Sequence, residues 1–156
     1  MISINRTDSD NKDFQALVVL LDKELHMRDG ADHSFYAQFN KIDNIRYALV
    51  AWLDKQPVGI GALRQYGSDS MEIKRMFVLP SCRRKGIAKE ILGALEAWAG
   101  ELGFTNCILE TGKKQPEAIQ LYRKAGYTII PNYGQYEHVE NSVCMAKQIV
   151  SSLAIQ

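Results

Sequence analysis

The sequence predicts an α/β or α+β domain, built on a mixed, mostly antiparallel sheet of six to seven strands with about four helices flanking it. Segments with strand character and segments with helical spacing follow one another in the order β-α-α-β-β-β-α-β-α-β-β. Three successive strands joined by short turns favour antiparallel neighbours, and the long helix after them suits a crossover. No linker or repeat interrupts the sequence, so we expect one domain over 1–156.

The first half reads as a strand, an amphipathic helix and a three-stranded meander. Thr7 and Asp10 are candidate helix-start residues, and Phe14, Leu17 and Leu21 follow at helical spacing. A Gly-containing or Pro-containing turn separates each strand of the meander from the next. The expected elements are a strand at 2–4, a helix at 11–28, a short helix within 31–43, strands at 46–53, 58–65 and 71–79, and turns at 54–57 and 66–70.

The second half begins with a strongly periodic helix. Ile87, Ile91 and Leu95 recur on one face of it, and Gly103 stands where a helix C-terminal glycine belongs. Pro116 suits the first turn of a later helix, which Gly126 ends. The expected elements are a helix at 87–102, strands at 106–111, 127–130 and 143–147, a helix from 116 to 125, and a polar loop at 131–142.

Composition excludes several classes of function. The formal net charge of +1 gives no overall electrostatic reason to expect nucleic acid or an anionic membrane as partner. No apolar run approaches the roughly 20 residues that cross a bilayer, and the first twelve residues lack the apolar core of a secretory signal. The 3 cysteines and 3 histidines show no metal-ligand spacing, so we expect no metal site and a reducing, cytoplasmic setting.

The segment 78–89 carries the strongest chemical signal. A strand ends there, and a basic turn containing Gly86 leads directly into a helix. Backbone N–H groups at a helix start, together with the positive end of the helix dipole, form a site for anions such as a pyrophosphate. The cationic side chains nearby are Arg83, Arg84, Lys85 and Lys89. The alternative interpretation of this turn is a solvated basic helix start.

Two motifs resemble those of the GCN5-related N-acetyltransferase (GNAT) family. Arg83-x-x-Gly86-x-Ala88 is similar to the family's [QR]-x-x-G-x-[GA] turn, and the run from Ala118 to Tyr127 is similar to its A-x-x-L-Y-x-K-x-G-[FY] motif. The element order agrees from about residue 2 to 147, which implies a GNAT-like fold. The resemblance implies an N-acetyltransferase that moves an acetyl group from acetyl-CoA to a primary amine.

The resemblance also implies a binding site for acetyl-CoA. The turn from Arg83 through Arg84, Lys85, Gly86, Ile87, Ala88 and Lys89 would bind the pyrophosphate through backbone amides. The backbone of Met76, Phe77 and Val78 would carry the pantetheine arm. The family often has Asn three residues before the Ala of the second motif, where this sequence has Gln115. Gln keeps the amide but places it one methylene further out.

Glu72 and Tyr122 are the candidate catalytic residues. Glu72 lies six residues before Val78, where histone-acetylating members of the family carry a general base. A glutamate in water is too acidic to be an efficient base, so this role requires a buried position. The alternative is a surface glutamate paired with Lys74 or Arg64. Tyr122 would donate a proton to the leaving thiolate, or else serve as a core aromatic.

Other functional groups are less well defined by the sequence. A backbone N–H near Phe77 or Val78 would stabilise the oxyanion, as the resemblance implies. Cys82 lies beside two arginines, but no neighbouring base favours a covalent acyl-enzyme. Polar and aromatic residues in two segments would wall the acceptor site, or else be ordinary solvated surface. They are Asp22, Glu24, His26, Asp29, Asp32, His33 and Tyr36 in the first segment, and Tyr133, Tyr136, Glu137, His138 and Glu140 in the second.

Two alternatives to an enzyme remain open at this point. A non-catalytic acyl-CoA-binding sensor or regulatory module would keep the basic turn but would not need Glu72 or Tyr122. A nucleic-acid-binding domain would use the basic turn, yet no aromatic-interleaved basic face accompanies it. We expect a small molecule or a protein amine as acceptor, and a homodimer is compatible with the resemblance.

Overall fold

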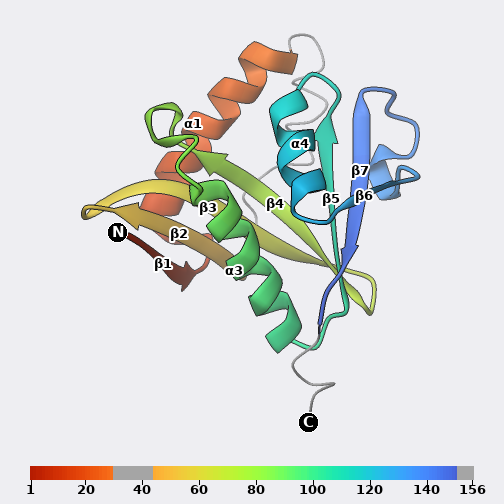
Figure 1. Ribbon diagram of the computed structural model, residues 1–156, viewed down its shortest axis with the longest axis horizontal. Helices are drawn as coiled ribbons and strands as arrows, with labels where there is room; N and C mark the ends of the chain where they lie inside the picture. The colour runs from red at the N-terminus through yellow and green to blue at the C-terminus, as the bar shows by residue number, and fades with distance from the viewer. Residues whose placement is uncertain (30–43, 151–156) are drawn as a thin grey trace. The chain divides into compact units, whose positions relative to one another are not determined.

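The computed structural model describes residues 1–29 and 44–150 (Figure 1). Within those residues, seven strands form one sheet in the order β1-β2-β3-β4-β5-β7-β6. The strands are β1 (Ile2–Thr7), β2 (Tyr47–Leu53), β3 (Gln56–Tyr66), β4 (Ser70–Val78), β5 (Asn106–Gly112), β6 (Thr128–Ile130) and β7 (Ser142–Gln148). The α-helices are α1 (Lys12–Asp29), α3 (Ile87–Glu101) and α4 (Pro116–Lys124). The short helix expected within 31–43 lies outside the described residues.

The sheet is mixed and mostly antiparallel, as the sequence predicts. β1 with β2, β2 with β3, β5 with β7 and β6 with β7 are antiparallel ladders. β4 and β5 are parallel, and their ladder runs from the Ser70–Asn106 pair to the Glu72–Ile108 pair. Two 3₁₀ turns add to the predicted elements, η2 (Pro80–Cys82) after β4 and η3 (Gly134–Tyr136) within the predicted polar loop.

The chain divides into two compact units. The first consists of Met1–Arg64 and Lys74–Leu95, and the second of Gln65–Ile73 and Glu96–Gln156. β4 therefore begins in the second unit and ends in the first, and α3 begins in the first and ends in the second.

In the first unit, α1 packs on one face of the sheet. Asn11 Oδ1 accepts the backbone N–H of Phe14 at 2.9 Å and so caps the helix start. The sequence pointed instead to Thr7 and Asp10, which is a correction of one to four residues. The buried face of α1 and the strands below it form one core cluster, whose buried members are Phe14, Leu17, Val18, Leu21, Ala48, Val50, Ile60, Ala62 and Phe77.

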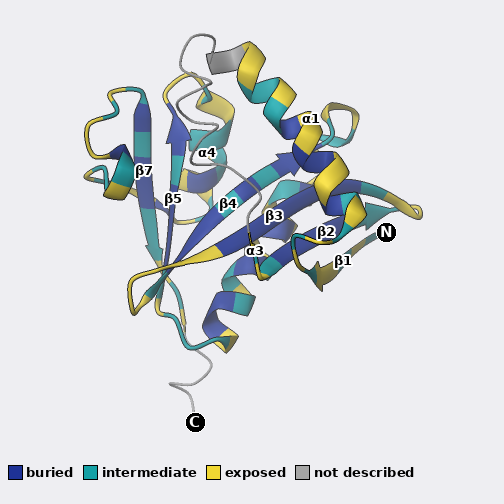
Figure 2. Cartoon of the chain, turned by 180° about the vertical axis from the view of Figure 1, so that it is seen from behind, coloured by how far each residue is buried: buried dark blue, intermediate teal, exposed yellow. Residues whose placement is uncertain are grey.

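The opposite face of the same strands carries α3. A Cβ built on Gly59 would lie 2.8 Å from Ile91 Cδ1, and one built on Gly61 would lie 2.7 Å from Ile91 Cγ2. These two glycines alternate with Ile60 and Ala62, so β3 presents side chains to α1 and bare backbone to α3. Figure 2 shows β3 and β4 dark along most of their length, as strands covered on both faces should be.

The β2–β3 turn is tighter than the sequence indicated. Asp54 and Lys55 both have positive φ, at 51° and 66°, and they alone separate Leu53 from its partner Gln56. A two-residue turn with this backbone suits the right-handed twist of a hairpin. Pro57, predicted to lie in the turn, belongs to β3 and pairs with Trp52 at a register shift, where a missing N–H is tolerated.

In the second unit, the two faces of the sheet at β5 and β7 differ chemically. Ile108 and Glu110 of β5, with their β7 partners Ala146 and Cys144, point to one face. Cys107 and its partner Lys147 point to the other side. We name these the glutamate-110 face and the cysteine-107 face, after one residue on each.

Among the described residues, no helix is long and apolar enough to cross a lipid bilayer.

Candidate functional site

The basic turn of the first unit has the backbone expected of an anion site. The first backbone hydrogen bond of α3 runs from the Glu90 N–H to the Gly86 carbonyl at 3.1 Å. The N–H groups of Ile87, Ala88 and Lys89 come before that bond and lack a helical acceptor. They are the groups that would bind a pyrophosphate.

Gly86 is required at its position for a conformational reason. Its φ of +81° lies in the left-handed region, and a Cβ built on it would meet nothing within 4 Å. The space beside the backbone is therefore open. Arg84 also has a positive φ, at 66°, which costs a non-glycine residue on the order of 1 kcal/mol or more.

The basic side chains of the turn divide into two kinds. Arg84, Lys85 and Lys89 are exposed, and so their charges face solvent and any bound anion. Arg83 is half-buried and turned toward the protein, because its Nε donates to the Val78 carbonyl at 2.9 Å and its Nη2 to Glu24 Oε1 at 2.7 Å.

Arg83 therefore serves the turn as a brace. Its guanidinium also lies 5.6 Å from the centre of the Phe77 ring. The sequence grouped Arg83 with the other cations of the turn, and it offered no sign that a carboxylate 59 residues earlier would neutralise it. The backbone amide of Arg83 remains a candidate phosphate contact.

β4 contains a kink that sequence reasoning missed. Arg75 has a φ of +59° and is buried, and its Nη1 lies 3.3 Å from Asp22 Oδ1 on α1. The kink immediately precedes Met76, Phe77 and Val78, whose backbone is the candidate pantetheine contact. The available signal was a pair of consecutive charged residues, Lys74 and Arg75, in the middle of the strand.

Glu72 is a buried carboxylate in the second unit. Only 3% of the residue is exposed, and it ends the β4–β5 ladder opposite Ile108, on the glutamate-110 face. The Tyr133 hydroxyl donates to Glu72 Oε2 at 2.5 Å. The alternative interpretation, a surface glutamate paired with Lys74 or Arg64, is wrong, because the side chain is out of solvent and bonded to a phenol.

Two further tyrosines lie against Tyr133, the donor of that hydrogen bond. The ring centre of Tyr133 lies 4.9 Å from that of Tyr66 and 5.8 Å from that of Tyr136, both edge-on. Tyr136 is 1% exposed, so the interpretation of this loop as solvated surface is wrong for its two tyrosines. Burial, then the charge of Glu72, raises the pKa of both Tyr133 and Tyr136, so both remain protonated donors at neutral pH.

A second carboxylate belongs to the same face. Glu110 Oε2 accepts a hydrogen bond from the buried Ser142 hydroxyl at 2.7 Å. The charge of Glu110 also contributes to the raised pKa of Tyr136. The glutamate-110 face therefore combines two carboxylates with tyrosine side chains, an environment that suits a cationic amine. The sequence offered no motif for Glu110.

Tyr122 lies on the other side of the second unit. The residue is 7% exposed, and its ring centre is 5.9 Å from that of Tyr127. Tyr127 donates to Glu96 Oε2, and Glu96 Oε1 binds Nζ of Lys147 on the cysteine-107 face. Burial, then the charge of Glu110, raises the pKa of Tyr122. The phenol thus keeps its proton, as a general acid must.

Gln115 lies just before α4, at the end of β5. Its backbone N–H donates to the Gly112 carbonyl at 3.0 Å. A Cβ on Gly112 would lie 3.7 Å from Gln115 Nε2, so the amide group is beside the strand end. No side-chain hydrogen bond caps the helix at Gln115.

Of the acceptor-wall residues expected in the first segment, the structure describes some and not others. Asp22 and Glu24 are engaged with Arg75 and Arg83. Asp32, His33 and Tyr36 lie outside the described residues.

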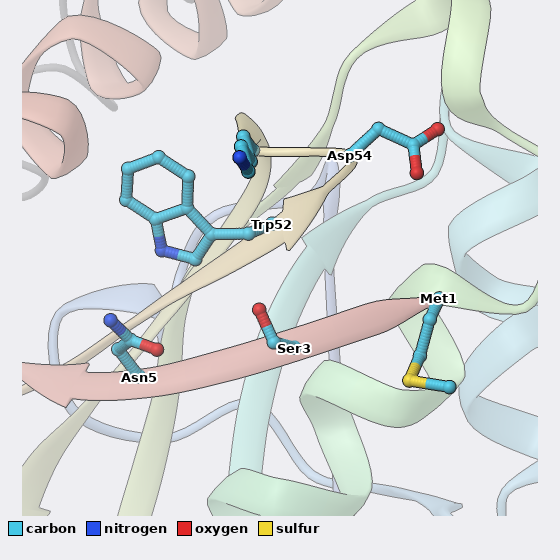
Figure 3. Close-up of a pocket in the computed structure, with 6 residues that line it drawn as sticks. Met1, Ser3, Asn5, Trp52 and Asp54 are labelled. Atoms are coloured by element: carbon cyan, nitrogen blue, oxygen red, sulfur yellow. The ribbon is translucent and has the colours of Figure 1, made fainter.

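A separate hollow opens at the β1–β2 edge of the first unit (Figure 3). It has a volume of about 450 Å³ and is lined by Met1, Ser3, Asn5, Trp52, Asp54 and Lys55. None of the predicted site residues contributes to it. Trp52 Nε1 is buried there without a hydrogen-bond partner among the described residues, and the hollow holds no cluster of groups able to perform acyl transfer.

The chain is similar to known acetyltransferases over most of its length. It is 36% identical over 111 residues to the IAA acetyltransferase of Azospirillum brasilense, covering 68% of this chain and 69% of that protein. It is 37% identical over 92 residues to the uncharacterized N-acetyltransferase YjgM of Escherichia coli, covering 58% of this chain. That match spans only 55% of the Escherichia coli protein.

Solved structures share the fold. A proposed acyl-CoA N-acyltransferase from Klebsiella pneumoniae superposes with a TM-score of 0.79 at 28% identity, covering 96% of this chain and 98% of that one. The PaiA N-acetyltransferase of Thermoplasma acidophilum, solved in complex with coenzyme A, superposes with a TM-score of 0.71 at 18% identity, covering 95% and 99%.

The family assignment then follows from the sequence itself. The profile of the acetyltransferase (GNAT) family matches residues 14–127, a stretch that holds both motifs and the strands from β2 to β5. The chain belongs to the acetyltransferase (GNAT) family.

Proposed function

We propose that this chain is an N-acetyltransferase that moves an acetyl group from acetyl-CoA to a primary amine by direct transfer. The observation that carries the proposal is the buried Glu72 carboxylate, hydrogen-bonded to Tyr133. Burial of a carboxylate is costly, and a module that only bound acyl-CoA would have no use for it. This observation favours the enzyme over the sensor or regulatory alternative.

The first unit would bind the acyl donor. Backbone amides of Ile87, Ala88 and Lys89 would bind the pyrophosphate, with Gly86 leaving room for it and exposed cations adding attraction. The backbone of Met76, Phe77 and Val78 would bind the pantetheine arm, and an N–H of Phe77 or Val78 would stabilise the oxyanion. The exposed cations are Arg84 and Lys85 together with Lys89. In the second unit, the Gln115 amide would add a further contact to the pantetheine arm.

The second unit would supply the proton transfers. An alkylammonium has a pKa near ~10.4, so only about one molecule in 2,500 is neutral at pH 7. Glu72 would first take a proton from the ammonium, and the neutral nitrogen then attacks the thioester carbonyl. The carbon–sulfur bond breaks, and the Tyr122 hydroxyl would give its proton to the departing thiolate. The second proton released by the nitrogen, passed through solvent, would restore the phenol.

The acceptor is a small-molecule or protein amine in this proposal. Two carboxylates and three tyrosines on the glutamate-110 face support a cationic acceptor. The relative called IAA acetyltransferase adds IAA to the compounds worth testing. A cytoplasmic location and a homodimer are parts of the same proposal.

Calorimetric titration with acetyl-CoA tests the donor site. We expect micromolar binding by the wild-type chain and a loss of about a hundredfold or more in Gly86→Glu, which places an anion where the pyrophosphate would lie. The matched control is Gly67→Glu, because Gly67 also has a positive φ, at +71°, and open space around it. If wild type does not bind, or if Gly67→Glu loses as much affinity, the donor site is wrong.

A thiol-release assay then tests the reaction. Acetyl-CoA is supplied with a panel of amines (amino acids, polyamines, aminoglycosides, lysine peptides and peptide N-termini), with IAA included. Release of coenzyme A that depends on one of these acceptors supports the enzyme. Tight acetyl-CoA binding without turnover of any acceptor would instead support the non-catalytic module.

A further inference from the structure

We propose that Tyr133 is a positioning residue, which holds the Glu72 carboxylate in the orientation needed for proton abstraction. This inference rests on the proposed role of Glu72 as general base. Tyr133 belongs to neither of the two family motifs in the sequence, and only the structure brings it to Glu72.

The hydrogen bond between the two residues constrains the carboxylate. At 2.5 Å from the Tyr133 hydroxyl to Glu72 Oε2, it has the length of a charge-assisted O–H···O⁻ bond. A carboxylate has about four lone-pair positions, and this bond occupies one. With Oε2 held, the orientation of the whole group about its terminal torsion is set, and capacity remains to accept a proton.

Tyr133 is itself held in place by its surroundings. The rings of Tyr66 and Tyr136 contact it edge-on from two directions. Asn132 Nδ2 donates to two backbone carbonyls of the same loop, at 3.1 and 3.2 Å. Gly134 turns the chain with a φ of +53°. The phenol is therefore positioned before any substrate arrives, which is what a supporting residue needs.

Other titratable groups lie near the same carboxylate. The charge of Glu72 acts on Tyr136 from η3 and on Cys144 from β7, and Glu110 on β5 acts on the same two groups. Tyr133 differs from them because its hydroxyl donates a hydrogen bond directly to Glu72. Removing that hydroxyl is therefore the change that tests the pair.

The chain offers a matched control on the opposite face. Tyr127 also donates its hydroxyl to a glutamate, Glu96, at 2.9 Å, and Tyr127 is 2% exposed. Tyr133→Phe and Tyr127→Phe each remove one phenol-to-carboxylate hydrogen bond. Only the first should affect the reaction, while both should lose stability.

The test compares kcat and KM of acetyl transfer for the two variants, with the best acceptor of the amine panel. We expect Tyr133→Phe to lower kcat by about tenfold or more, with KM for acetyl-CoA unchanged. Tyr127→Phe should keep the wild-type kcat. Equal kcat values for the two variants would overturn the proposal.

A spectroscopic measurement makes the proposal testable without any acceptor. A strongly hydrogen-bonded phenol proton gives a downfield, slowly exchanging proton resonance. We expect one such resonance that is absent from both Tyr133→Phe and Glu72→Gln and present in Tyr127→Phe. Its persistence in Glu72→Gln overturns the proposal. If no amine is acetylated by wild type, the proposed function fails, and this resonance alone decides whether Tyr133 holds Glu72.

Discussion

Two glutamates of the second unit, the buried Glu72 and the half-buried Glu96, each accept a hydrogen bond from a tyrosine, and the two pairs differ in one respect. Glu96 receives the Tyr127 hydroxyl on one oxygen and the Lys147 ammonium on the other, both at 2.9 Å. Glu72 receives the Tyr133 hydroxyl. The Glu96 carboxylate is neutralised by Lys147 of β7, whereas the hydrogen bond to Glu72 comes from a neutral donor.

The difference separates a structural pair from a pair that is able to react. A carboxylate bonded to a phenol and an ammonium has its charge satisfied and ties α3 to β7. A carboxylate that is 3% exposed and bonded to a phenol is a costly arrangement in terms of stability. Such groups are expected where function requires them.

The largest contrast should appear in catalysis. We expect Glu72→Gln to lower kcat/KM by about a hundredfold or more, the usual effect of removing a general base. Glu96→Gln should stay within a few-fold of wild type. Steady-state rates of coenzyme A release, measured on both variants at equal fold content by circular dichroism, decide this. Similar losses in both would remove the distinction between the two pairs.

Stability should show the reverse order. Glu96→Gln breaks an ion pair whose side chains are 15% and 29% exposed for Glu96 and Lys147, and we expect a loss of about 1–3 kcal/mol. Glu72→Gln should lie within about 1 kcal/mol of wild type, or above it, because a buried charge is removed. Urea denaturation of both variants measures the free energy of unfolding. A larger loss in Glu72→Gln would show that its carboxylate is structural.

The loop that carries Tyr133 depends on a glycine. A Cβ at Gly134 would lie 3.3 Å from Tyr66 Oη, at a φ of +53°, so we expect Gly134→Ala to cost about 1 kcal/mol. Gly93→Ala is the control, since a Cβ there meets nothing within 4 Å in the middle of α3, and it should stabilise by up to about 1 kcal/mol. Thermal melts of the two variants should therefore shift in opposite directions.

The smallest effects should be seen in the reactivity of two cysteines, Cys107 beside the Glu96–Tyr127 pair and Cys144 beside the Glu72–Tyr133 pair. Burial raises the pKa of Cys107 to about 12 and that of Cys144 to about 11. Both should resist alkylation by iodoacetamide at pH 8 in the folded protein and react in urea, while the half-exposed Cys82 reacts in both. Mass spectrometry of labelled peptides measures this. Labelling of Cys107 in the folded state at pH 8 would contradict it.

The same pKa shifts affect stability at high pH. An unfolded thiol begins to ionise near pH 9, the ordinary value, whereas the folded Cys107 thiol keeps its proton until about pH 12. The contribution of this group to stability is therefore complete below pH 9 and is lost as the pH rises towards 12. Cys107→Ala should show a shallower fall in unfolding free energy over that window.

Much of the fold could be predicted from the sequence because its elements are strongly periodic. The helix from Ile87 and the strand from Asn106 begin at the predicted residue, and the parallel β4–β5 pair follows from the crossover. The helix expected at 11–28 begins within one residue of α1, but its cap Asn11 was missed, because several cap-forming residues precede α1 and Asn11 is the one that accepts the Phe14 N–H.

The candidate site was predicted in part. Its motifs point to the turn at Gly86 and to Tyr122, since backbone chemistry and local spacing define both. Tyr133 was named as a candidate wall of the acceptor site, but its bond to Glu72 could not be predicted, because the two residues lie 61 positions apart. The ion pair between Arg83 and Glu24 could not be predicted either, since partners 59 residues apart leave no local sequence pattern.

The two glycines of β3 determine where the proposed donor site can form. The start of α3, which presents the proposed phosphate-binding amides, can lie where it does because Gly59 and Gly61 have no side chains in its path. Any larger residue at 59 would meet Ile91 and, at 3.2 Å, the Phe77 carbonyl. The proposed donor site therefore depends on two residues without side chains, some 25 residues before the turn. A search for the sequence motif of the turn alone would not include them.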